Sequence, residues 1–211
     1  APEGIVMQIR KDAETAQLRA DCALLCTGRR PLLHQKELEA AGIDYDLKGI
    51  KTNARMMTSA NDIYAAGDVT GGMMLAHRAA VQAKVAAQSM FGGSDYKYDE
   101  NVIPSVVYSH PQIARVGYTQ RRAADEGLSV EVMKSSYSAN IIARTELMGQ
   151  GFVKALFHHN EIIGAVIAGD NAADLIAPLG LAVSCRLTRK QLKSWVIAHP
   201  TLSEIFVDLQ W

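Results

Sequence analysis

The chain has 211 residues, 48% hydrophobic and 21% charged, a composition typical of a globular protein with one or two cores and not of a disordered or fibrous one. Its 22 Lys and Arg residues equal its 22 Asp and Glu residues, so no net charge favours nucleic acid or an anionic membrane as a partner. Apolar stretches such as residues 175–183 fall well short of the roughly 20 residues that a membrane span needs. From the charge balance and these short stretches together, we expect neither a nucleic acid nor a membrane partner.

The three cysteines are too few for a secreted disulfide framework and favour a reducing compartment, with the cytoplasm as the default. Cys22 and Cys26 lie in an apolar segment expected to be a buried strand, which separates positions four apart by about 13 Å. A disulfide cannot span that distance, so both are expected to be core residues. The first residues lack Met and any signal pattern, and the chain therefore resembles a piece of a longer protein.

Residues 1–98 alternate short apolar runs with helical patterns and predict an α/β remnant of a nucleotide-binding or central region. Strands are expected at 5–9, 22–27 and 62–66, and helices at 35–41 and 74–90. The run Gly92-Gly93-Ser94-Asp95 ends the last helical pattern. The polar and aromatic residues 96–101 after it are the best candidate for a linker.

From residue 102 onwards, strands and helices predict an α+β domain in which an antiparallel sheet carries helices on one side. Strands are expected at 105–109, 113–118, 129–137, 152–158 and 162–168, with the last two forming a hairpin. Helices are expected at 119–127, 172–185, 189–198 and from about 202. Pro200 separates the last two helices.

The segment from His199 to Glu204 combines an imidazole with a carboxylate near the end of the chain. Thr201 followed three residues later by Glu204 is the pattern of a capping box, which would satisfy the free amides of a helix start. In a second interpretation Glu204, also or instead, accepts a ring proton of His199, which fixes the tautomer and raises the basicity of the imidazole, as a general base requires. A histidine beside proline is more often a turn residue, and the residues alone leave these interpretations open.

A second candidate region follows the expected strand 62–66. That strand would place Gly67 and Asp68 at its carboxyl end, before a glycine-containing turn and the helix expected at 74–90, which carries His77 in its first turn. Ligands of α/β sheets bind outside the carboxyl ends of strands, where a helix start offers free amides, so Asp68 is a candidate for binding sugar hydroxyls. In the alternative interpretation Asp68 is a turn residue and His77 a solvated side chain in the first helical turn.

Other chemical signatures are missing from the sequence. No cluster of Cys, His or carboxylate residues has the spacing of zinc ligands, so no metal site is expected. Neither the G-x-G-x-x-G fingerprint nor the G-x-S-x-G elbow occurs. Candidate chemistry therefore rests on the two regions already described.

Five motifs together resemble one known family. The chain is similar to the C-terminal half of a pyridine nucleotide-disulfide oxidoreductase, and most similar to the dihydrolipoamide dehydrogenase group of that family. The resemblance covers nearly all 211 residues. Its motifs, in family order, are Thr27-Gly28-Arg29-Arg30-Pro31, Ala66-Gly67-Asp68, Met74-Leu75-Ala76-His77, Tyr108-Ser109-His110-Pro111 and His199-Pro200-Thr201-Leu202-Ser203-Glu204. The Met-Leu-Ala-His run favours this group over glutathione reductase, mercuric reductase and soluble transhydrogenase.

The resemblance implies FAD and NAD as cofactors of the longer protein. Asp68 would contact the ribityl and phosphate region of the flavin, and Gly28 would lie near the nicotinamide nucleotide. The residues implied to lie along the isoalloxazine ring are Met74, Leu75, Ala76 and His77.

The resemblance also implies a two-fold homodimer formed by the C-terminal domain. His199 of one subunit, oriented by Glu204, would be the acid–base residue for the flavin and redox disulfide of the other subunit. Electrons would pass from dihydrolipoyl groups to a cysteine pair, then to FAD and NAD, after His199 removes a thiol proton. A lipoyl-bearing 2-oxo acid dehydrogenase complex is the partner that this reaction implies.

The chain departs from the family pattern in one respect. Both dinucleotide fingerprints and the C-x-x-x-x-C pair are missing from the sequence, and Cys22 and Cys26 do not replace that pair. We therefore expect an inactive, dimerising fragment that does not itself bind FAD or NAD. The expected division is the end of an NAD-binding domain at 1–20, a central FAD-contacting segment at 21–98 and an interface domain at 99–211. The alternatives are an isolated dimerisation module and a fragment of a related disulfide reductase.

Overall fold

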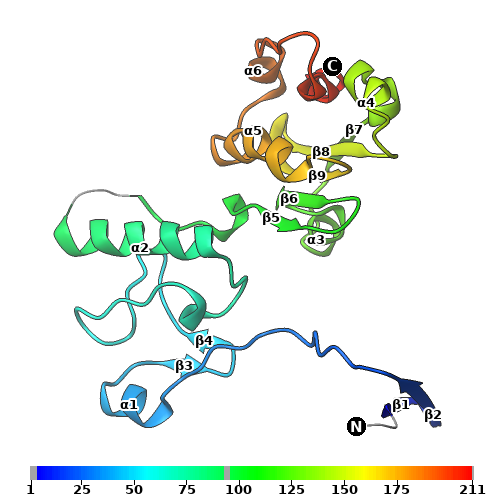
Figure 1. The fold of residues 1–211 in the computed structure, drawn as a ribbon. Helices are drawn as coiled ribbons and strands as arrows, with labels where there is room; N and C mark the ends of the chain where they lie inside the picture. Colours follow the sequence, from blue (N-terminus) through cyan, green and yellow to red (C-terminus); the bar gives the residue numbers. More distant parts are fainter. Residues whose placement is uncertain (1–3, 93–95, 211) are drawn as a thin grey trace.

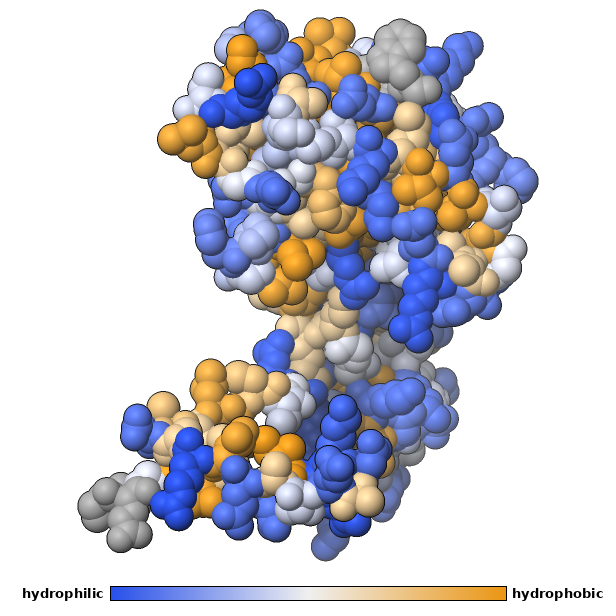
Figure 2. Space-filling view, turned by 90° about the vertical axis from the view of Figure 1, so that its right-hand side faces the viewer, coloured by the Kyte–Doolittle hydropathy of each residue, from blue (hydrophilic) through white to orange (hydrophobic). Residues whose placement is uncertain are grey.

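A computed structural model describes residues 4–92 and 96–210. Figure 1 shows an upper body built on strands β5 to β9, a lower body built around helix α2, and an N-terminal hairpin that stands apart at the end of an extended segment. In the space-filling view of Figure 2, the upper and lower bodies are two lobes joined by a narrow waist. The two candidate regions of the sequence lie in different bodies.

The N-terminal hairpin pairs β1 (Ile5–Lys11) with β2 (Glu14–Ala20) in antiparallel register. The expected strand 5–9 is found, whereas β2 was not expected.

Residues 21–34 have no regular structure, so the strand expected at 22–27 is wrong. Leu24 and Leu25 are 89% and 87% exposed, and Cys22 and Cys26 are also exposed and are not core residues. A strand is held by the ladder of a neighbouring strand, and no strand of the described chain pairs with this segment.

The lower body contains α1 (Gln35–Ala40), the short antiparallel strands β3 (Tyr45–Asp46) and β4 (Gly49–Ile50), the 3₁₀ helix η1 (Asp68–Thr70) and α2 (Ala76–Phe91). Helix α2 ends at Gly92, whose φ of 71° is the left-handed conformation that favours glycine after a helix. Gly93, Ser94 and Asp95 lie outside the described residues.

The expected strand 62–66 is wrong, because only a single bridge between Met57 and Tyr64 forms there. Among the described residues, the first part of the chain therefore has two antiparallel hairpins and no parallel sheet, which corrects the expected α/β remnant. The physical reason is that parallel strands depend on neighbours and on cover over both faces, and the described residues supply neither. A small cluster of Met56, Val85 and Ala86 holds this segment against α2 instead.

The upper body is a five-stranded antiparallel sheet with the order β5-β6-β9-β8-β7. Its strands are β5 (Ser105–Val107), β6 (Ile113–Gly117), β7 (Glu131–Ser136), β8 (Phe152–His158) and β9 (Glu161–Ala168), preceded by the 3₁₀ helix η2 (Glu100–Val102). His159 and Asn160 join β8 to β9 with φ values of 47° and 67°, as in a tight hairpin turn. The expected antiparallel sheet is therefore found, with every expected strand in place.

The helical elements of the upper body are α3 (Gln120–Asp125), the 3₁₀ helix η3 (Tyr137–Ala139), α4 (Ile141–Thr145), α5 (Ala172–Ser184), α6 (Arg189–Lys193) and the 3₁₀ helix η4 (Leu202–Gln210). Helix α4 was not expected. Helix α6 begins with a capping box between Thr188 and Gln191 but ends five residues before the expected end at 198. The next residues run as a loop to Pro200, consistent with the bias against helix before proline.

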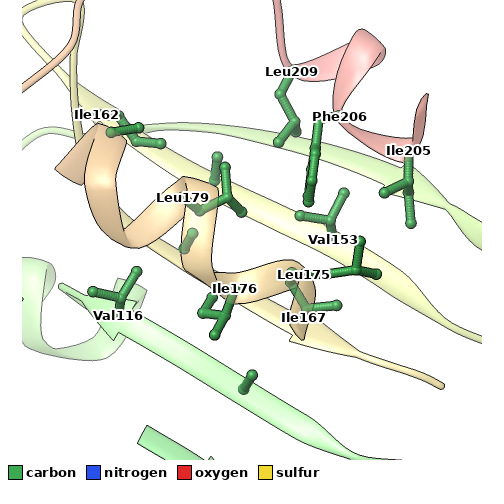
Figure 3. Packing of buried hydrophobic residues seen from close by; sticks show 14 of the residues in the cluster. Val116, Val153, Ile162, Ile167, Leu175, Ile176, Leu179, Ile205, Phe206 and Leu209 are labelled. Atoms are coloured by element: carbon green, nitrogen blue, oxygen red, sulfur yellow. The ribbon is translucent and has the colours of Figure 1, made fainter. Parts of the chain in front are cut away.

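The main core lies between the sheet and the helices that cover one of its faces (Figure 3). Leu179 of α5 and Phe206 of η4 are each 1% exposed and pack over Val153 and Ile167, which are fully buried. Each such side chain contributes roughly 1.5–3 kcal/mol by leaving water.

Candidate functional site

The loop between α6 and η4 holds His199 and Glu204 in direct contact. The Nδ1 atom of His199 lies 2.9 Å from Oε1 of Glu204. The imidazole is 72% exposed, whereas the glutamate side chain is only 25% exposed. The carboxylate therefore contacts the Nδ1 side of the ring, and the rest of the ring faces solvent.

Glu204 also accepts a hydrogen bond from the backbone of the same loop. Its Oε2 atom lies 3.0 Å from the backbone N of Thr201. This N–H, and secondly the hydrogen bond with His199, lower the pKa of the Glu204 carboxyl group. The carboxylate is therefore ionised at neutral pH and can only accept hydrogen bonds.

The state of Glu204 fixes the tautomer of His199. Because an ionised carboxylate cannot donate, Nδ1 of His199 must carry the shared proton. In the neutral imidazole the other ring nitrogen, Nε2, then keeps its lone pair. The arrangement can take a proton at Nε2 and return it.

The two interpretations of this segment are both partly realised. Glu204 reaches back to the N–H of Thr201, as in a capping box. The Thr201 hydroxyl, however, donates to the carbonyl oxygen of Ala198 at 2.7 Å and does not cap the helix start. Glu204 thus serves the backbone and the imidazole together, one with each carboxylate oxygen.

The second candidate region surrounds Asp68. Gly67 has a φ of 83°, and its N–H donates to Oε1 of Gln82 in α2 at 2.8 Å. Thr70 donates to the Gly67 carbonyl at 2.8 Å, which closes the turn. Gln82, 1% exposed, thus fixes the turn that presents the exposed Asp68 carboxylate.

Met74 and Leu75 lead into α2, and Ala76 and His77 are its first two residues. Leu75 is the residue before the first helical position and supplies no side-chain cap, so the amides of the first turn are left for another partner. His77 donates through Nε2 to the carbonyl oxygen of Pro104 at 2.7 Å. Its side chain is therefore part of the connection between the two bodies and is not merely solvated.

Arg29 joins the parts of the second region and was not among the expected site residues. Its guanidinium donates to the carbonyl oxygen of Met74 at 2.5 Å and lies 3.8 Å from the Asp68 carboxylate. It thereby brings the Gly28 segment beside the start of α2; Gly28 itself is exposed with a φ of 94°. The signal in the sequence was an arginine beside the glycine of the Gly28 motif, but its partners depend on tertiary structure.

The two candidate regions are not brought together within one chain. In Figure 1 the loop between α6 and η4 lies at the end of the upper body away from η1 and the start of α2. Among the described residues, no group of three or more His, Cys, Asp or Glu residues could hold a metal ion. No helix of the described segments is long and apolar enough to cross a membrane.

Two family descriptions match the chain over most of its length. The dimerisation domain of the pyridine nucleotide-disulphide oxidoreductases matches residues 103–210, which include the whole sheet of the upper body and the His199 loop. The pyridine nucleotide-disulphide oxidoreductase description matches residues 2–83, which include Gly28 and the Asp68 turn. The chain belongs to the pyridine nucleotide-disulphide oxidoreductases.

Individual relatives show which members of this family the chain is similar to. The dihydrolipoyl dehydrogenase of Bacillus subtilis is 36% identical over 210 residues, which are 98% of this chain and 44% of the relative. The crystal structure of LpdA from Mycobacterium tuberculosis has a TM-score of 0.88 and 27% identity, covering 99% of this chain and 45% of that one. The HOCl-induced flavoprotein disulfide reductase RclA from Escherichia coli, in its Cu(II) complex, has a TM-score of 0.80 and 25% identity over 95% of this chain and 47% of that one. The chain thus spans less than half the length of the relatives it matches.

Proposed function

We propose that this chain is the C-terminal part of a longer dihydrolipoyl dehydrogenase, which oxidises dihydrolipoyl groups with NAD through a redox disulfide and FAD. The observation that carries the proposal is the contact between His199 and Glu204, which leaves Nε2 of the imidazole free to take a proton. The identity of 36% with the Bacillus subtilis dihydrolipoyl dehydrogenase supports this choice of substrate.

His199 acts on the substrate thiol in the proposed reaction. Nε2 accepts the proton of one thiol of the dihydrolipoyl group, and the electron pair of the broken S–H bond stays on sulfur as a thiolate. The thiolate is the species that can attack a disulfide, because a thiol is a poor nucleophile. Glu204 stabilises the resulting imidazolium through the Nδ1–H hydrogen bond and keeps the ring in one orientation.

The residues of the second region fit a flavin. Asp68 offers an exposed acceptor for hydroxyl groups. The first-turn amides of α2, from Ala76 and His77 onwards, can donate to an electron-rich ring edge, and Met74 and Leu75 lie immediately before them. Gly28 would lie beside the nicotinamide nucleotide. When bound, FAD would supply the two-electron chemistry that these side chains cannot perform.

The whole protein is proposed to be a homodimer joined through residues 99–211, with the end of an NAD-binding domain at 1–20 and a central FAD-contacting segment at 21–98. The separation of Asp68 from His199 within one chain supports a site shared by two subunits. A lipoyl-bearing 2-oxo acid dehydrogenase complex is the proposed partner, and the cytoplasm the proposed location. The chain alone is proposed to be inactive.

A second candidate is a related disulfide reductase, and the structural similarity to RclA favours keeping it. The same His199 and Glu204 pair could activate a thiol of another dithiol or disulfide substrate. Turnover of dihydrolipoamide, compared with turnover of other disulfides by the full-length protein, separates the two candidates.

The test of the proposed base is His199→Gln in the full-length protein. We expect lipoamide turnover to fall by roughly 10²–10⁴-fold, the contribution of a positioned acid–base group, while FAD stays bound. The matched control is His34→Gln, because His34 is 70% exposed and also lies beside a glutamate, Glu37, but precedes α1 in the lower body. Near-normal turnover of His199→Gln would refute the base assignment.

The test of the fragment is its absorbance spectrum. We expect the 211-residue chain to purify without flavin, because the fingerprint for FAD is missing from its sequence. Stoichiometric bound flavin would contradict the proposal that this chain holds only half of a site. A dimer mass in solution scattering would support the interface proposed for residues 99–211.

A further inference from the structure

Asn140, which precedes α4, contacts the backbone of the His199 loop. Its Nδ2 atom donates to the carbonyl oxygens of Thr201 and Leu202, at 3.1 and 3.3 Å. Its Oδ1 atom accepts the N–H of Ala143 at 3.0 Å and so caps α4. The two ends of one amide thus join α4 to the start of η4.

Asn140 is only 6% exposed, so these hydrogen bonds are shielded from water. A buried amide left without partners is costly, which favours keeping both ends of the Asn140 amide hydrogen-bonded. The residue also lines one cavity with His199 and Glu204, in which Asp208 is the remaining titratable group. The Asp208 carboxylate accepts a hydrogen bond from Ser135 of β7 at 2.6 Å, so η4 is held at its far end as well.

Asn140 contacts the residues that orient the imidazole of His199. The Thr201 N–H holds one oxygen of Glu204, and the other oxygen of Glu204 holds Nδ1 of His199. The hydrogen bonds from Asn140 to the Thr201 and Leu202 carbonyl groups therefore hold the stretch of backbone that places Glu204 beside the His199 ring. Ala198 accepts from the Thr201 hydroxyl, but that bond lies within the same loop and does not tie the loop to the domain.

We infer that Asn140 is a positioning residue for the proposed base: by holding the Thr201 and Leu202 carbonyl groups, its side-chain amide sets the place and orientation of the His199 and Glu204 pair relative to the sheet. The inference rests on the proposed function for its effect on turnover, but not for its effect on the geometry of the pair. A displacement of a catalytic group by about 1 Å can cost roughly a hundredfold in rate.

The experiment uses Asn140→Ser in the 211-residue chain and in the full-length protein. Serine keeps a hydroxyl oxygen that can cap α4, but removes the amide that donates to two carbonyl groups. Asn140→Asp is the second variant, because it is nearly isosteric and also loses the donor; an effect common to both variants follows from the lost amide and not from added charge. The matched control is Asn101→Ser, the same substitution at a half-buried residue before β5.

Two measurements on the 211-residue chain read the geometry directly. In nitrogen-15 NMR we expect the signal of the hydrogen-bonded Nδ1–H of His199 to be lost or weakened in both Asn140 variants and kept in the control. In carbon-13 NMR we expect the titration of the Glu204 carboxyl carbon in Asn140→Ser to move up towards that of an ordinary glutamate. In the full-length protein we expect kcat to fall roughly a hundredfold with FAD retained, against less than twofold for the control.

An unchanged Nδ1–H signal and Glu204 titration in both variants would overturn the inference, whatever the turnover. If Asn140→Ser does not fold, the Nδ1–H signal of Asn140→Asp decides alone. Changed NMR signals in a protein whose turnover survives His199→Gln would support the positioning and refute the proposed base. The two failures are therefore distinguishable.

Discussion

Gln82→Leu should release the turn that presents Asp68. Leucine is close in size to glutamine but has no acceptor, so the Gly67 N–H and the Thr70 hydroxyl lose the oxygen that lies 2.8 and 3.3 Å away. Gln82 is 1% exposed, so water cannot replace that oxygen without opening the site. The substitution thus leaves a buried donor without a partner at the base of the turn.

The size of the effect follows from the lost contacts. A buried backbone N–H left unsatisfied costs roughly 1–3 kcal/mol. The Thr70 hydroxyl adds little, because it keeps its shorter bond of 2.8 Å to the Gly67 carbonyl. Since 1.4 kcal/mol is a factor of ten, amide exchange of Gly67 through local opening should become faster by a factor of about 5 to 150.

Amide hydrogen exchange followed by NMR measures this opening at Gly67 itself. The matched control is Gln88→Leu, which makes the same change on an exposed position of the same helix. In the full-length protein, Gln82→Leu should also weaken FAD retention, because Asp68 follows Gly67 directly. Equal exchange rates at Gly67 in the two variants would refute the assigned role of Gln82.

Two further predictions concern the upper body. Phe206→Ala should destabilise it by about 3–5 kcal/mol, because the ring is 1% exposed and stacks on Trp195 with 5.5 Å between the ring centroids. Urea unfolding followed by tryptophan fluorescence measures the loss of stability. Val207 is the more exposed neighbour, and an equal loss of stability in Val207→Ala would contradict the reasoning. Burial, and then the charge of Asp170, raise the pKa of Tyr137 to about 12. Because the native state holds this proton more tightly than the unfolded chain, stability should be full below about pH 10 and fall as the pH rises towards 12. Tyr137→Phe should reduce that alkaline loss in urea midpoints measured across this range, and an unchanged slope would count against it.

The second half of the fold was predictable because its signals are local. The β8 and β9 strands alternate around a short turn, and α5 carries its apolar residues along one stretch of sequence. Helix α4 was missed because five residues are too few for a helical period to emerge. Its one available signal was Asn140, a residue favoured at helix starts.

The first half was less predictable because its apolar runs need distant neighbours. The segment 22–27 has the composition of a buried strand, but composition does not supply the strand beside it. The contact of His199 with Glu204 could be expected from their spacing, since five residues separate them and both lie beside a predicted turn. Arg29 could not be assigned in the same way, because 45 residues separate it from Met74, its hydrogen-bond partner.

The placement of Asp68 and His199 in different bodies of one chain has a genetic consequence if the proposed dimer forms. A complete site would then take its flavin-contacting turn from one subunit and its base from the other. A subunit altered at Asp68 and a subunit altered at His199 would each be inactive in their own homodimers. A heterodimer of the two would retain one intact site and one doubly defective site. Two defective alleles in one cell would therefore complement each other, whereas two alleles altered at the same residue would not.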